Sequence, residues 1–98
     1  MNALIIGGDN LGTIENKLKQ KGFENIQHIT GRKDYQKINE KMKGINIDLI
    51  IILVDYINHS VMHNVKKASK KMDAKTIFTK RSWVYIENHI NEFISLKN

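Results

Sequence analysis

The sequence contains no cysteine, so it can form neither a disulfide framework nor a thiolate metal site. Proline is also absent. The longest apolar run covers residues 49–54, which is too short to span a bilayer. Met1 is followed directly by a strand-like run, without the charged segment and cleavage site of a secretory signal. These absences predict a cytoplasmic protein that does not enter the membrane.

The 98 residues are enough for one domain, 1–98, with a modest core. The formal net charge of +6 favours anionic partners such as phosphates, nucleic acid or a carboxylated ligand. The alternative is that the lysines only solvate the surfaces of helices.

Strand-like and helical patterns alternate along the chain. Short apolar runs predict strands over 3–6, 26–30, 49–54 and 75–79. Apolar residues at helical spacing predict helices over 11–18, 35–43 and 58–72, and from Ser82 onward. This order predicts a parallel sheet with right-handed crossovers. The fold class is therefore a single three-layer α/β domain, flavodoxin-like or half-Rossmann, with strand order 2-1-3-4 and the first and last helices on one face.

In open α/β sheets, ligands bind beyond the carboxyl ends of the strands, where the winding reverses. Here that point lies between the first and third strands, so Gly8, Asp9 and Asp55 are expected to be close together. The candidate binding residues follow the strand ends or lie on the helix after the third strand: Gly7, Gly8, Asp9, Arg32, Asp55, Tyr56, His59, Lys66, Lys80, Arg81 and Ser82.

The glycine segment at 7–12 resembles a dinucleotide-binding loop but lacks its middle glycine, because that position is Asp9. A carboxylate there would crowd and repel a pyrophosphate. Two interpretations stay open. The segment is either a tight strand-to-helix turn, with Gly12 allowing close packing, or a direct ligand contact.

His59 and His63 are four residues apart, so they share one face of the predicted helix with Lys66 and Lys70. They are candidate metal ligands, and the alternative is a solvated outer face. The helix dipole disfavours imidazolium at His59, and iron requires the neutral imidazole. Ser60 stands where a zinc protease motif has glutamate, which argues against that enzyme class.

Several segments together resemble a bacterial family known as domain of unknown function 2325. They read LIIGGDNLG, HITGRK, DYINHS with a later VKK, and FTKRSW. The resemblance covers nearly the whole chain and supports the α/β fold. At matching positions it draws attention to Gly7, Gly8, Asp55, His59, Lys66 and Arg81, and it implies no catalytic role.

The leading functional hypothesis is a module that binds or senses a small ligand. The ligand is haem, with His59 axial, Tyr56 or His63 nearby and Lys66, Lys70 or Arg81 at the propionates, or it is an anionic metabolite. One alternative is a small enzyme that acts on a phosphorylated or nucleotide substrate, with Asp55 and His59 as an acid–base pair and Arg81 holding an anion. A nucleic-acid-binding protein is the other alternative, and it depends on charge alone.

A homodimer is also predicted. The reasons are the small core and the second stripe on the helix at 58–72, with Met62 at its border.

Overall fold

A computed structural model describes residues 1–30 and 46–97 of the chain. The strands are β1 (Asn2–Ile6), β2 (Asn25–Ile29), β3 (Leu49–Leu53) and β4 (Lys75–Thr79). The helices are α1 (Ile14–Gln20), α3 (His59–Lys70) and α4 (Trp83–Lys97), with a 3-10 turn at Val54–Tyr56. The helix predicted over 35–43 and the candidate residue Arg32 lie outside the described residues.

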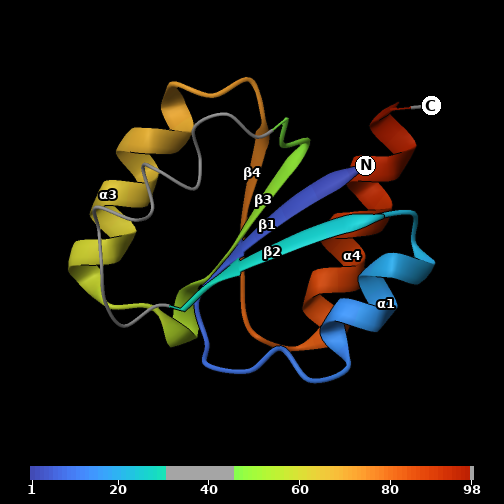
Figure 1. Cartoon of the computed structure of the whole chain (residues 1–98), viewed down its shortest axis with the longest axis horizontal. Coiled ribbons are helices and arrows are strands. Elements are labelled where there is room, and N and C mark those ends of the chain that lie inside the picture. Colours follow the sequence, from blue (N-terminus) through green and yellow to red (C-terminus); the bar gives the residue numbers. More distant parts are fainter. Residues whose placement is uncertain (31–45, 98) are drawn as a thin grey trace.

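The four strands form one parallel sheet in the order β2-β1-β3-β4. The predicted fold class and strand order are therefore confirmed. Helix α3 covers one face of the sheet, and α1 and α4 cover the other (Figure 1). The predicted placement of the first and last helices on one face is confirmed.

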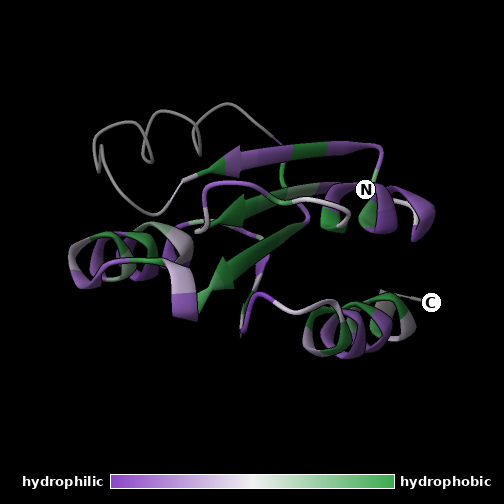
Figure 2. Cartoon of the chain, turned by 90° about the horizontal axis from the view of Figure 1, so that it is seen from below, coloured by the Kyte–Doolittle hydropathy of each residue, from purple (hydrophilic) through white to green (hydrophobic). Residues whose placement is uncertain are grey.

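Two apolar clusters hold the layers together. Successive side chains of a strand point to opposite faces, so the aliphatic run of β3 supplies both clusters. Ile51 packs with Leu18 and Ile90 on the α1 and α4 side, whereas Ile50 packs with Val61 on the α3 side. All five residues of β3 are fully buried, as expected of a central strand. The central strands β1 and β3 are mostly hydrophobic, whereas the edge strand β2 and the helices carry both kinds of residue (Figure 2).

The third strand ends one residue earlier than the sequence predicts. Val54 begins the 3-10 turn, and 41% of its surface is exposed. The apolar run therefore continues past the edge of the sheet, where Val54 joins the exposed surface.

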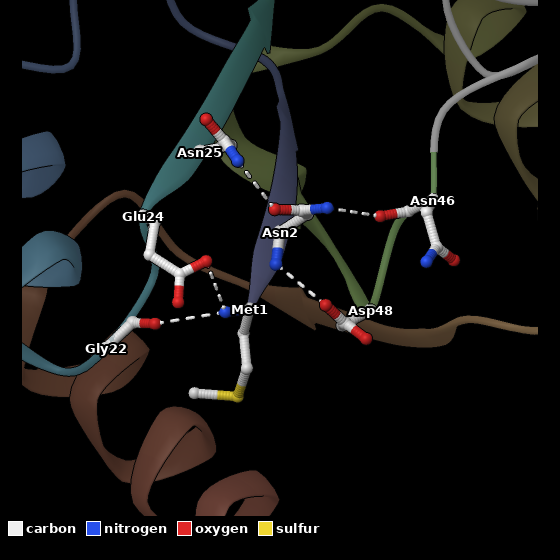
Figure 3. A network of polar contacts seen from close by, with 7 residues as sticks. All are labelled: Met1, Asn2, Gly22, Glu24, Asn25, Asn46 and Asp48. Atoms are coloured by element: carbon white, nitrogen blue, oxygen red, sulfur yellow. Dashed lines mark hydrogen bonds and ion pairs between the residues drawn. The ribbon is translucent and has the colours of Figure 1, made fainter.

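Polar side chains join the strands at the opposite, amino-terminal edge of the sheet (Figure 3). The Asp48 carboxylate accepts a 2.7 Å hydrogen bond from the backbone N–H of Asn2. The Asn2 side chain donates to the carbonyl of Asn46 at 2.7 Å and accepts from the side chain of Asn25 at 3.0 Å. These contacts fix the start of β1 against β2 and against the segment that enters β3.

Candidate functional site

The turn after β1 is built on two buried glycines with positive φ, +117° at Gly7 and +73° at Gly8. Their N–H groups donate to the carbonyls of Ile29 and Tyr56, each at 2.9 Å. A Cβ atom on Gly7 would lie 3.0 Å from the carbonyl oxygen of Leu53 and 3.1 Å from that of Tyr56. Gly7 is therefore part of a tight turn that fits between the ends of β2 and β3, where no side chain has room.

His28 holds the same turn from β2. Its Nε2 atom lies 2.8 Å from the carbonyl oxygen of Gly7, and because a carbonyl only accepts, Nε2 is the donor. The sequence alone did not single out His28, and this contact was not predicted. The available signal was the parallel pairing of the first two strands, which sets His28 beside Ile5, two residues before Gly7.

Arg81 crosses from the loop after β4 to the glycine turn. Its guanidinium donates a hydrogen bond to the carbonyl of Asn10, and its Cζ atom lies 5.9 Å from the centroid of the Tyr56 ring. A Cβ atom on Gly8 would be in ordinary contact with the Arg81 side chain, at 3.6 Å. The structure thus places one half-buried cation against both the glycine turn and an aromatic ring.

Asp55 connects the loops that follow β3 and β4. Its Oδ1 atom accepts a 2.9 Å hydrogen bond from the backbone N–H of Arg81. Together with the Gly8–Tyr56 hydrogen bond, this contact brings Gly8, Asp55, Tyr56 and Arg81 into one cluster, which we call the Arg81 cluster. It lies at the carboxyl ends of β1, β3 and β4.

The histidines begin helix α3 beside this cluster. Asn58 caps the helix, since its side chain accepts a 2.8 Å hydrogen bond from the N–H of Val61. His59 is the first helical residue, three positions after Tyr56, and it is exposed. His63 is also exposed, one turn further along. Within residues 1–30 and 46–97, no group of three or more histidine, aspartate or glutamate residues could hold a metal ion.

The predicted lysines point to other contacts. The Lys66 ammonium lies 5.6 Å from the centroid of the Phe78 ring, and that of Lys80 lies 5.5 Å from the Tyr85 ring. Ser82 accepts the first backbone hydrogen bond of α4, from Ile86 at 3.0 Å. Asp9 is exposed. The ring contacts of Lys66 and Lys80 thus lie outside the Arg81 cluster, which is centred on Arg81 itself.

The surface next to the Arg81 cluster is partly apolar. Val54 and Tyr56 are 41% and 55% exposed, and Ile57 is half-buried. All three precede His59 in the same segment. This segment therefore offers apolar area, an aromatic ring and an imidazole side by side along the chain.

Among the described residues, no helix is long and apolar enough to cross a membrane. A bacterial family described as uncharacterized, DUF2325, matches residues 2–93, so the chain belongs to this family. No curated protein and no solved structure matches the chain. The family match agrees with the resemblance seen in the sequence and assigns no activity.

Proposed function

We propose that this DUF2325 protein is a binding or sensing module for a small anionic ligand, with its site at the Arg81 cluster. One observation carries the proposal: the Arg81 guanidinium is held beside the glycine turn by Asn10 and the Tyr56 ring. A guanidinium has five N–H donors, and that of Arg81 donates a hydrogen bond to the carbonyl of Asn10. The remaining donors suit a carboxylate or a phosphate.

The position of the cluster supports the proposal as well. It lies at the carboxyl ends of the strands beside the reversal between β1 and β3, where open α/β sheets bind their ligands. Backbone contacts fix it, because Gly8 binds the carbonyl of Tyr56 and the N–H of Arg81 binds Asp55. A site fixed in this way loses little entropy when a ligand binds.

The test is a titration with inorganic phosphate, followed by calorimetry, on the wild type, Arg81→Gln and Lys80→Gln. Both variants lose one positive charge, but the ring contact of Lys80 is with Tyr85 and that of Arg81 is with Tyr56. We expect Arg81→Gln to weaken binding roughly tenfold or more, the effect of one lost charge-assisted hydrogen bond. Lys80→Gln should change affinity by less than about threefold, as exposed charges do. Equal losses in the two variants would contradict a site at Arg81.

Haem is the second candidate ligand, and the exposed apolar segment favours it. Val54 and Tyr56 offer apolar and aromatic surface before His59, which is exposed at the start of α3. Under this proposal the His59 imidazole is the axial ligand, and Arg81 meets a propionate. A haem pocket combines these elements: an axial ligand, apolar surface and a cation.

Haemin titration of the wild type, His59→Ala and His63→Ala tests this version. The two variants form a matched pair, because both histidines are exposed on α3, one turn apart. A saturable Soret shift in the wild type that His59→Ala alters and His63→Ala preserves would support axial ligation by His59. A wild type without a saturable shift eliminates haem and leaves the anionic ligand. Equal behaviour of all three proteins would place any haem site elsewhere.

Two further measurements test the alternatives proposed from the sequence. Nucleic-acid binding requires an affinity that falls steeply with salt concentration, because phosphate contacts release counterions. An acid–base enzyme requires turnover that depends on both Asp55 and His59. One carboxylate oxygen of Asp55 already accepts a hydrogen bond from the backbone N–H of Arg81. In an acid–base pair with His59, Asp55 would therefore act through its other oxygen.

A further inference from the structure

Strand β4 forms one edge of the sheet, and it pairs only with β3 among the described strands. The backbone N–H of Lys75 donates to the carbonyl of Asp48, 3.2 Å away, so it faces β3. Because backbone groups alternate along a strand, the N–H and C=O groups of Thr76 and Phe78 face outward. They present two donors and two acceptors along the free edge.

A groove lies on each side of this edge. One, of about 310 Å³, is lined by Lys66, Ser69, Lys70, Thr76 and Phe78 and lies between β4 and α3. The other, of about 350 Å³, lies between β4 and α4, and its lining includes Ile77, Phe93 and Leu96. The side chains of a strand added to this edge would enter the two grooves alternately.

Phe78 makes this edge unusual. It is 43% exposed and lines both grooves. The other edge of the described sheet, β2, carries no large hydrophobic residue that is exposed to this degree. Edge strands usually avoid exposed apolar side chains, because such strands pair with other chains.

The charges around the edge indicate what kind of chain would pair there. Lys66 and Lys70 border the α3 groove, and Lys75 begins β4. Glu92, in the α4 groove, is the one carboxylate that lines either groove among the described residues. A second copy would bring two lysine-rich edges together, which is unfavourable. A segment of another protein that directs carboxylates toward α3 would instead be complementary in charge to Lys66 and Lys70.

We propose that the β4 edge binds an extended peptide segment of a partner protein, added to the sheet as a further strand. Main-chain hydrogen bonds to Thr76 and Phe78 supply affinity, as in other cases of strand addition. Acidic side chains at alternate positions face Lys66 and Lys70. The apolar side chains between them enter the α4 groove beside Ile77.

The probe is a capped peptide of alternating glutamate and leucine, as long as β4, with a lysine–leucine peptide of equal length for comparison. Titrations are followed by calorimetry and by amide NMR spectra of the full chain. We expect the acidic peptide to bind at least about tenfold more tightly than the basic one, because several attractions to lysines become repulsions in the basic peptide. Binding should also slow hydrogen exchange at the Thr76 and Phe78 amides.

Two matched pairs of variants test the contacts. Thr76→Pro removes an outward N–H, which an edge strand tolerates, whereas Thr76→Val keeps it. We expect Thr76→Pro to weaken acidic-peptide binding roughly fivefold or more, the effect of one lost main-chain hydrogen bond, and Thr76→Val by less than twofold. Lys66→Glu should weaken binding of the acidic peptide to a similar extent as Thr76→Pro. Lys67→Glu should leave this affinity unchanged, because Lys67 is exposed on α3 but lines neither groove.

Circular dichroism and urea midpoints establish that each variant is folded. If Thr76→Pro unfolds, the exchange data on the wild type decide the question. Equal affinity for both peptides, no binding at millimolar peptide, or protection confined to other amides would overturn the proposal. A wild-type dimer that becomes monomeric in Thr76→Pro would overturn it too, because a second copy would then occupy the edge.

Discussion

Replacing Gly7 with alanine should destabilise the domain far more than the same change at Gly12. Gly7 has φ +117°, and its added Cβ would lie 3.0 Å from the Leu53 carbonyl oxygen. The turn cannot shift easily, because Gly7 N–H binds Ile29 and its carbonyl binds His28. Backbone strain and overpacking each cost about 1–3 kcal/mol, so we expect a total near 3–5 kcal/mol.

Gly12 is the control, since it also has positive φ but has space around it. Its φ is +58°, within the left-handed region that other residues can enter, and the nearest atom to an added Cβ is Nη2 of Arg81 at 3.8 Å. Gly12→Ala should therefore cost about 1–2 kcal/mol at most. Part of that cost is offset, because alanine lowers the entropy of the unfolded chain.

Urea unfolding followed by tryptophan fluorescence measures both variants. Trp83 is the single tryptophan, and it packs against the core at the start of α4. At roughly 1–3 kcal/mol per molar urea, the midpoint of Gly7→Ala should fall by about 1 M or more, or the variant should be unfolded without urea. Coincident midpoints for Gly7→Ala and Gly12→Ala would refute the argument from packing at Gly7.

Four further predictions follow from the fold. Ile51→Asp places an unpaired charge in the middle of the fully buried β3, so the variant should lose several kcal/mol and show no cooperative thermal transition; a stable, soluble variant would contradict the assignment of the core. Asp48→Ala leaves the N–H of Asn2 without its carboxylate and should lower the free energy of unfolding by about 1–3 kcal/mol in urea titrations. Asn58→Ala removes the cap on Val61 N–H and should cost about 1 kcal/mol, visible as a lower melting temperature. The predicted homodimer should give a dimer mass by light scattering; a monomer mass at high concentration would show that prediction to be wrong.

Much of the fold could be predicted because a small number of residue patterns are enough to determine it. The aliphatic run in β3 has no polar alternation, which only a strand covered on both faces permits. Strand and helix patterns alternate, so right-handed crossovers left few strand orders to consider. The end of β3 could not be predicted, because Val54 continues the apolar run. It is the tertiary contact from Gly8 to Tyr56 that holds the chain in a turn there.

The candidate site was predictable in location but not in its contacts. Strand ends in a parallel sheet meet at one edge, so Gly8 and Asp55 could be placed near each other from topology alone. The family resemblance draws attention to Arg81 and not to Lys80, but no residue pattern indicates which of the two lies beside the glycine turn, since both follow β4. The difference arises because the backbone N–H of Arg81 is fixed by Asp55, which directs its side chain across to Asn10.

Arg81 contributes to the structure as well as to the proposed site, and the two contributions can be separated. Arg81→Gln keeps the backbone N–H that donates to Asp55 and loses only the contacts to Asn10 and the Tyr56 ring. Both partners are exposed, so their loss should cost about 1–2 kcal/mol. A domain with about 5–15 kcal/mol of stability then remains folded in nearly every molecule. A tenfold loss of ligand affinity in this variant would therefore come from the missing guanidinium and not from unfolded protein.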